Sequence, residues 1–269
     1  MIYVSILRRG HAMSVWLQEN SWVEVKKYLD SGEKLIIIPI GSTEQHGCHL
    51  PVGADTMVAI MLAEDAAKRT NTLVAPPLWY GWSPHHLALP GSVSVRAEVL
   101  IEIMYDIIRS LHIHGFNKYV VINGHRIVNI AWMQISAERA QRELGVRVKL
   151  FDPAYMSKGL QQSLCYGPVG HAEEIETSHM LYRHPELVHL ENAKDNPIQS
   201  TELYSVDPAF EGDTLCYVPS TVHDMQRSID VAGGTTGTPS KSDAQKGRQY
   251  HYHLVDKLVR VIEILKVNA

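Results

Sequence analysis

Carboxylate and imidazole side chains follow closely on two apolar runs of the sequence. Glu44 and His46 come just after the run LIIIPI, and Asp55 follows nine residues after His46. Side chains two residues apart in an extended segment point the same way, so Glu44 and His46 can face one site. His125 follows a second apolar run, YVVI, within the segment NGHRIVN. This set of oxygen and nitrogen ligands suits one hard or borderline divalent ion, or a pair of them.

Two further segments carry titratable side chains. In GHAEEIETS, residues 170–178, Glu176 could complete a metal site. His171 of the same segment could move a proton, because the ordinary pKa of histidine lies near neutrality. In YGWSPHHLALPG, residues 80–91, His85 and His86 could line a pocket in a loop shaped by Gly and Pro.

Each of these residues can also be explained by a structural role, without metal binding or catalysis. Asp55 could cap the helix that follows it. The acids at 173, 174 and 176 would place favourable negative charge near a helix N-terminus. Glu44 and His46 could be hydrogen-bonded loop residues, and His125 a turn residue. The spacing alone leaves these alternatives open.

The elements that must position these side chains alternate along the chain. The expected strands cover residues 35–40, 73–77, 119–122 and 146–151, and the expected helices cover 56–69, 97–112, 127–144 and 243–266. A further helix begins at a capping box of Ser21 and Glu24 and ends at Gly32. Short apolar strands separated by helices indicate a mostly parallel sheet covered on both faces, so the predicted class is α/β. Residues 193–240, rich in Pro, Gly, Asp and Thr, are expected to form long loops.

Composition limits the other classes of function. The chain has 269 residues, 45% of them hydrophobic, and no internal repeat or linker, so we expect a single domain over residues 1–269. A net charge of -4 without a basic block argues against a nucleic-acid partner. No apolar run approaches the ~18 residues of a membrane span. Three widely spaced cysteines and no secretory signal indicate a cytoplasmic protein.

Taken together, five motifs resemble those of the creatininase family of metal-dependent amidohydrolases in order and spacing. They are GSTEQHGCHLPVGADT, PPLWYGWSPHHLALPGSVSV, NGHRIVN, HAEEIETS and GGTTGTPSKSDAQKG. The resemblance covers about residues 20–262 of the chain. It implies a single creatininase-like α/β domain with two divalent ions per subunit, zinc or manganese and in some members iron. It also implies a small-molecule substrate and a homo-oligomer, often a hexamer.

The resemblance also implies roles for individual residues. The positions that match the family's metal ligands are Glu44, His46, Asp55 and His125. Asp55 stands in the position that bridges the two ions, and Glu176 matches a glutamate that supplies the remaining ligand in many members. His171 matches the histidine assigned as a proton shuttle. The implied reaction is metal-assisted hydrolysis, in which the ions activate a water molecule and His171 protonates the leaving group.

Several departures from the family pattern concern the substrate. Ile127 stands where creatininase itself has a glutamate ligand, Gly170 replaces an acid, and the pocket tryptophans of creatininase have no counterpart. These departures argue against creatinine. Arg126, which replaces a glycine of many members, and His86 are the candidate substrate-binding residues. A guanidinium fork suits a carboxylate, phosphate or polyhydroxylated substrate, and the alternative for Arg126 is a structural salt bridge.

Three functions remain open on the sequence. The first is hydrolysis of the C–N bond of a small, cyclic amide. The second uses the same site for hydrolytic C–C ring opening of a keto-inositol or keto-sugar. The third is a metal-dependent small-molecule-binding protein without catalysis, which the missing glutamate at Ile127 keeps open.

Overall fold

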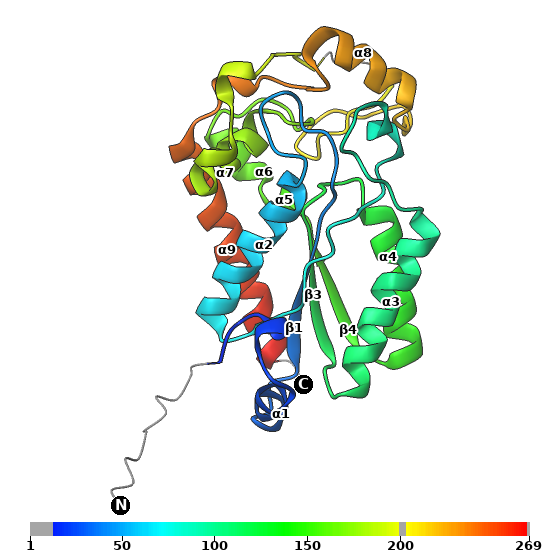
Figure 1. Cartoon of the computed structure of the whole chain (residues 1–269), viewed down its shortest axis with the longest axis vertical. Coiled ribbons are helices and arrows are strands. Elements are labelled where there is room, and N and C mark those ends of the chain that lie inside the picture. Colours follow the sequence, from blue (N-terminus) through cyan, green and yellow to red (C-terminus); the bar gives the residue numbers. More distant parts are fainter. Residues whose placement is uncertain (1–12, 199–202, 268–269) are drawn as a thin grey trace, which may run out of the picture.

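A parallel sheet forms the centre of the molecule. The computed structural model describes residues 13–198 and 203–267. Its four strands, β1 (Leu35–Ile40), β2 (Leu73–Val74), β3 (Lys118–Asn123) and β4 (Arg147–Phe151), lie in the order β2-β1-β3-β4 and are all parallel. Helices cover both faces of the sheet (Figure 1). The predicted α/β class is confirmed.

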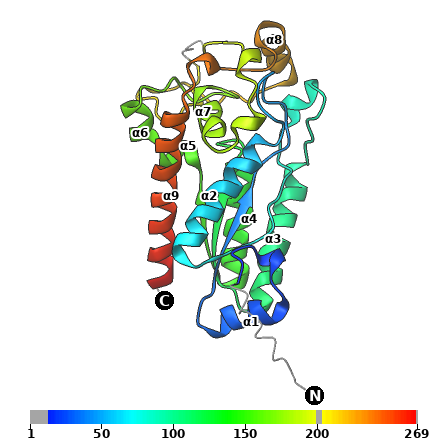
Figure 2. The same cartoon turned by 60° about the vertical axis from the view of Figure 1, so that its left-hand side comes forward.

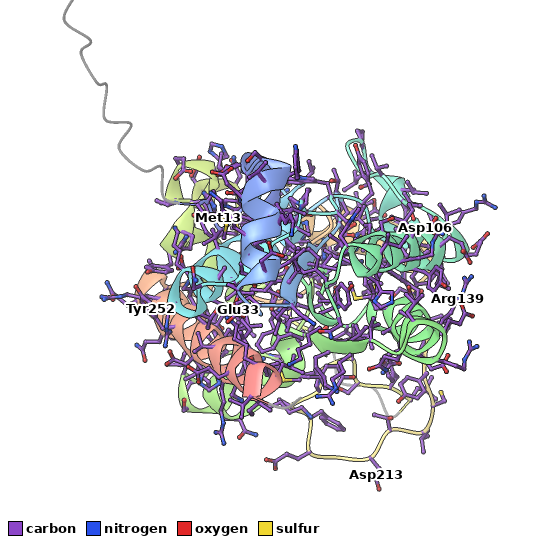
Figure 3. The ribbon with its side chains drawn as sticks, turned by 90° about the horizontal axis from the view of Figure 1, so that it is seen from below. Met13, Glu33, Asp106, Arg139, Asp213 and Tyr252 are labelled. Carbon is purple, nitrogen blue, oxygen red and sulfur yellow. The ribbon has the colours of Figure 1, made fainter. Side chains whose placement is uncertain are left out.

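The helices divide between the two faces of the sheet. The α-helices are α1 (Trp22–Asp30), α2 (Ala54–Thr70), α3 (Ala97–Ile113), α4 (Ile130–Leu144), α5 (Pro153–Met156), α6 (Lys158–Ser163), α7 (Glu174–Arg183), α8 (Val222–Ala232) and α9 (Ala244–Val267). Helices α2 and α9 lie on one side and α3 and α4 on the other (Figures 1 and 2). In the view from below, Tyr252 of α9 and Arg139 of α4 lie on opposite sides of the molecule (Figure 3). Within the described ranges, no helix combines the length and the apolar character that a membrane crossing requires.

Alternate residues of each central strand fill two separate cores. In β1, Leu35 and Ile37 pack into the core that includes α2 and α9, whereas Ile36, Ile38 and Ile40 pack into the core that includes α3 and α4. Successive side chains of a strand point to opposite faces. Because both faces are covered, the strand is apolar throughout instead of alternating with polar residues.

The strand order brings the loops after β1 and β3 together. From β1 the chain goes to β2 on one side, and it then returns to form β3 on the other side of β1. Ligand sites of parallel sheets lie beyond the carboxyl ends of strands at such a switch point. Gly124, just after β3, allows the close approach of α2, since a Cβ there would lie 1.9 Å from the carbonyl oxygen of Asp55.

Two expected elements differ from the structure by three residues at one end. Strand β2 stops at Val74 instead of residue 77, because Pro76 and Pro77 have no N–H to donate to a neighbouring strand. The helix expected from Ile127 begins at Ile130. Ile127 has a φ of 69°, in the left-handed region, which a right-handed helix does not use.

The prediction of long loops over residues 193–240 was wrong in part, because this segment contains α8. The side chain of Thr221 accepts a hydrogen bond from the backbone N–H of Asp224, and the two residues form a capping box. Gly233 ends the helix with a φ of 64°. Helix α8 lies at the end of the molecule beyond the carboxyl ends of the strands (Figure 1).

Candidate metal centre

The predicted ligands converge beyond the carboxyl ends of β1 and β3. Their ligand atoms form two groups, Glu44 with Asp55 and His125, and His46 with Asp55 and Glu176, and a third group joins Glu44 and His46 to His171. The atoms of each group lie within 4.8 Å of one another. All five predicted ligands are buried. Asp55 belongs to the first two groups, so one carboxylate could bridge two ions.

The position of Asp55 removes the alternative in which its side chain caps the helix. Gly53 occupies the cap of α2, and Asp55 lies in the first turn. Its Oδ1 is 3.2 Å from Nε2 of His46, and its Oδ2 is 2.9 Å from Nδ1 of His125. The carboxylate therefore lies between the two imidazoles instead of capping the helix.

The backbone fixes the orientation of the His46 ring. Nδ1 of His46 is 3.1 Å from the carbonyl oxygen of Glu44. A carbonyl oxygen only accepts hydrogen bonds, so Nδ1 carries the proton in the neutral ring. Nε2 then turns its lone pair toward Asp55 and Glu176, which is the arrangement of a ligating histidine held by a hydrogen bond at its other nitrogen.

The buried acids give the site a strong preference for positive charge. Burial lowers the pKa of His46, but the carboxylates of Asp55, Glu176 and Glu44 outweigh burial and raise it to about 10. Burial also opposes the charged form of His125, but Glu44 and Asp55 raise its pKa to about 9. Burial acts against the charge of Asp55, yet the two histidines hold its pKa well below the ordinary value. In the absence of metal, protons therefore supply the positive charge.

Two oxygens of the site fit a metal ion directly. Oε1 of Glu44 and Oδ2 of Asp55 are buried and accept no hydrogen bond of good geometry from the part of the chain that the structure describes. Nε2 of His86 lies 3.1 Å from the former and Nδ1 of His125 lies 2.9 Å from the latter. Carboxylate oxygens combined with imidazole nitrogens are ligands that zinc, manganese and iron all accept. The residues present therefore fit divalent ions.

Glu176 is shared between the metal centre and a buried ion-pair cluster. Nη2 of Arg126 lies 2.6 Å from Oε1 of Glu176 and 2.8 Å from Oε1 of Glu173. Oε2 of Glu176 accepts a hydrogen bond from the backbone N–H of Ala172 and lies 3.8 Å from Nε2 of His46. The salt-bridge alternative for Arg126 is therefore present in the structure, and its role in substrate binding stays a prediction.

His171 has one nitrogen directed at the backbone and one near the acids. Its Nε2 is 2.6 Å from the carbonyl oxygen of Gln45, so Nε2 donates and Nδ1 keeps its lone pair. Nδ1 lies 3.7 Å from Oε1 of Glu44. Burial, together with His86 and His46, holds the pKa of His171 well below its ordinary value. His171 is thus a neutral base beside the metal groups, and its role as proton shuttle stays a prediction.

His86 contacts the metal centre through Glu44. Its Nδ1 lies 2.9 Å from Nε2 of Gln45 and its Nε2 lies 3.1 Å from Oε1 of Glu44. Because the amide group donates to Nδ1, Nε2 carries the proton and faces Oε1 of Glu44. His86 and its neighbour His85 are both buried within a short 3-10 helix, Pro84–Ala88. Substrate binding by His86 stays a prediction.

Three residues near the centre were not predicted. Gln45 orients His86, and the hydroxyl of Ser83 donates to Oε2 of Glu44. Asp152 accepts hydrogen bonds from the backbone N–H of Ile127 at 2.6 Å and from Nδ2 of Asn123 at 2.8 Å, and so holds the loop that carries His125. Asp152 directly follows β4, so the strand-end rule that identified His125 could also have identified it.

Comparison with known sequences identifies related enzymes. A 3-dehydro-scyllo-inosose hydrolase of Thermotoga maritima is 33% identical over 187 residues, which are 67% of this chain and 60% of that protein. The match therefore spans less than two thirds of that relative. A creatinine amidohydrolase of Pseudomonas putida is 29% identical over 219 residues, which are 73% of this chain and 83% of the relative.

Solved structures agree over nearly the whole chain. A crystal structure of creatinine amidohydrolase (creatininase) superposes with a TM-score of 0.81 at 26% identity, covering 96% of this chain and 100% of that one. A manganese form of creatininase has a TM-score of 0.78 at 26% identity over 95% and 100% of the two chains. The family model described as "Creatininase: Creatinine amidohydrolase" matches residues 18–262. The chain therefore belongs to the creatininase family of metal-dependent hydrolases.

Proposed function

We propose that this enzyme uses two divalent ions to hydrolyse the C–N bond of a small, cyclic amide other than creatinine. The observation that carries the proposal is the shared position of Asp55 in two ligand groups. The named activity of the Pseudomonas putida relative, creatinine amidohydrolase, supports the bond type. The departures at Ile127 and Gly170 are the reason for excluding creatinine itself.

The two ligand groups would hold one ion each. Glu44 and His125 would bind the first, His46 and Glu176 the second, and Asp55 both. Two divalent ions bound there supply an acidified water molecule and polarise the substrate carbonyl. Zinc and manganese are the expected metals, since creatininase structures carry the descriptions "Zn-Zn type" and "Mn".

His171 would move the proton. Its Nδ1 lies next to Glu44 with its lone pair free, so that it could accept a proton from the attacking water. The protonated ring can then donate that proton to the leaving nitrogen, a step that typically contributes about a hundredfold to ten-thousandfold in rate. The hydrogen bond from Nε2 to the carbonyl oxygen of Gln45 holds the ring in place during both transfers.

The crowding of the site supports a small substrate. The ring centroids of His85 and His86 lie 4.0 Å apart, those of His86 and His171 lie 4.1 Å apart, and those of His171 and His46 lie 4.5 Å apart. These contacts leave little space around the ligands on that side. A long peptide or polymer would require the rings to separate.

A second candidate activity is ring opening of a keto-inositol by hydrolysis of a C–C bond. The observation that favours it is the 33% identity to the inosose hydrolase. The same activated water would attack a ketone, and a neighbouring carbonyl would stabilise the carbanion released. Protonation by His171 would complete this reaction as well.

One assay separates the two activities. The enzyme loaded with zinc or manganese is incubated with a panel of cyclic amides and with a panel of diketo-inositols, and substrate consumption is followed by chromatography. We expect turnover of cyclic amides, lost in the metal-free protein and reduced at least about a hundredfold in His171→Asn. Turnover of the inositol panel alone would replace the first proposal with the second. Tight binding without turnover of either panel would contradict both.

A further inference from the structure

A second histidine cluster lies between α7, α9 and α2, outside the metal centre. Nε2 of His179 is 2.9 Å from Nδ1 of His251, and Nε2 of His251 is 2.9 Å from Oδ2 of Asp65. The same oxygen accepts a hydrogen bond from Nη1 of Arg183 at 2.6 Å. Both imidazoles are buried, whereas Asp65 is partly exposed. None of these residues has a part in the hydrolysis proposed above.

The crossing of α7 and α9 brings the two histidines together. Gly247 of α9 faces the backbone of α7, and a Cβ there would lie 1.9 Å from the carbonyl oxygen of Ser178. His179 follows Ser178 in α7, and His251 lies one helical turn after Gly247 in α9. The contact is therefore set by two rigid helices instead of by a loop.

The acid at the end of the cluster determines which nitrogen of each ring carries a proton. The carboxylate of Asp65 accepts hydrogen bonds, so Nε2 of His251 carries the proton and its Nδ1 accepts from His179. Nε2 of His179 is therefore protonated, and Nδ1 of His179 keeps its lone pair. Burial lowers the pKa of both imidazoles, and that of His179 lies well below the ordinary value, so both rings are neutral near pH 7.

A small cavity adjoins His179 on the side of the metal centre. The residues that line it include Arg126, Glu176, His179 and Tyr250. The volume open to a water-sized sphere is about 10 Å³, which is about what a single water molecule needs. Nη1 of Arg126 is buried and has no hydrogen-bond partner among residues 13–198 and 203–267. Such an N–H is costly to leave unpaired, and ordered water is the usual partner.

We infer that this cavity binds one internal water molecule, which accepts a hydrogen bond from Nη1 of Arg126 and donates one to Nδ1 of His179. Asp65 and His251 are positioning residues, because they hold His179 in the tautomer that can accept. The water completes the hydrogen bonds of Arg126, whose other nitrogens hold Oε1 of Glu176. The cluster thus supports the carboxylate that faces His46. This water site does not depend on the substrate proposed above.

The first test uses the unaltered full-length protein. A high-resolution crystal structure should show a water molecule within hydrogen-bond distance of Arg126 Nη1 and His179 Nδ1. Long-range proton–nitrogen correlation spectra of protein labelled with nitrogen-15 in histidine should show both rings neutral with the proton on Nε2. Signals are assigned by comparison with His179→Gln and His251→Gln. An empty cavity, or a proton on Nδ1 of His179, overturns the inference.

The second test compares two changes at Asp65. In Asp65→Asn the amide oxygen can still accept from His251, so the tautomers should stay as in the unaltered protein. In Asp65→Ala this acceptor is lost, and we expect a mixture of tautomers at both histidines.

Zinc affinity, measured by chelator competition, should fall about tenfold in Asp65→Ala and stay within about twofold in Asp65→Asn, as for other groups that orient ligands. Unchanged tautomers in Asp65→Ala, or equal losses of affinity, contradict the positioning role. Neither readout uses a substrate, so failure of the hydrolase proposal would not be confused with failure of this one.

Discussion

The buried carboxylates are the residues on which the proposed chemistry depends. Asp55 lies within 4.8 Å of Glu44 in one ligand group and of Glu176 in another, and Arg126 pairs with both Glu176 and Glu173. Buried charges of one sign are costly unless cations neutralise them. Protons on the histidines can neutralise this negative charge in the metal-free protein, and divalent ions would neutralise it more completely. Metal binding and protonation therefore compete at the same residues.

The first prediction concerns Asp55, the carboxylate common to both ligand groups. Asp55→Asn keeps the size of the side chain but removes its charge, so both of the proposed ions would lose a ligand. We expect affinity for zinc to fall at least about a hundredfold, because the loss of an orienting group alone typically costs ten- to a hundredfold. Elemental analysis and chelator competition measure the change. Asp230→Asn on the exposed face of α8 is the control, and equal metal content in the two variants would refute the bridging role.

The second prediction concerns the pH dependence of the metal-free protein. The pKa of His46 is raised to about 10 and that of His125 to about 9, from an ordinary value of 6.5. A raised pKa stabilises the fold fully below the unfolded value, and this contribution is lost as the pH rises through the folded value. The metal-free protein should therefore lose stability between pH 7 and pH 10, with a fall in Tm of about 5 °C or more.

The variants that remove these charges provide the control for the pH prediction. In the double variant His46→Gln with His125→Gln, the decrease in Tm over the same pH range should be much smaller. Calorimetry of both proteins in the presence of a chelator makes the comparison. A metal-free protein whose Tm stays constant up to pH 10 would show that these imidazoles are not held protonated.

The types of residue in the site could be predicted from the sequence, but their partners could not. Glu44, His46 and His125 were identified because each follows a buried strand, and topology brings strand ends together. The contact of His86 with Glu44 depends on the rotamer of Gln45, which no sequence spacing encodes. Spacing likewise could not decide whether Arg126 binds substrate or pairs with Glu176, which lies 50 residues away in the sequence.

At the scale of the elements, the close crossing of α7 and α9 positions Glu176. Gly247→Ala would place a methyl group against the carbonyl oxygen of Ser178, where a Cβ comes within 1.9 Å. The helices must separate, and we expect a loss of about 1–3 kcal/mol in the free energy of unfolding, as for other overpacked positions. Urea titration measures it. The matched control is Gly159→Ala in α6, where a Cβ meets nothing within 4 Å and the change should be neutral or stabilising. Equal stability of the two variants would contradict this account of the crossing.

Elements with strong local signals were predicted well, and the misses have local causes. Strand β1 was predicted with its observed ends, because the unbroken apolar run has charged or glycine residues on both sides. Helix α1 begins at the predicted capping box. Helix α8 was missed although Thr221, Asp224 and Gly233 mark its ends, since the Pro, Gly and Thr around it dominated the composition. The late start of α4 depends on the left-handed backbone of Ile127, which hydrophobic periodicity does not reveal.

At the scale of the whole molecule, exposed apolar side chains gather in the segment around α8. Leu215 is 73% exposed, Tyr217 is 88% exposed and Val231 is 65% exposed. This segment lies at the end of the molecule beyond the carboxyl ends of the strands (Figure 1). The candidate metal centre, whose ligands follow β1 and β3, lies beyond the carboxyl ends of the strands as well. Exposed apolar side chains that gather in one region mark interaction sites more often than scattered ones do. The homo-oligomer expected from the family resemblance would cover them.

The last prediction is that subunits associate through the segment around α8. Light scattering of the 269-residue chain should give a mass several times 30.2 kDa. The double variant Tyr217→Asp with Val231→Asp places charges in the apolar contact, so it should dissociate to smaller species at the same concentration. Val267→Asp, at the far end of α9 and 83% exposed, is the matched control and should leave the mass unchanged. A monomer in the unaltered protein, or equal dissociation of both variants, would rule out this interface. Because the proposed ligands all come from one chain, the dissociated variant should still bind zinc, which elemental analysis can verify.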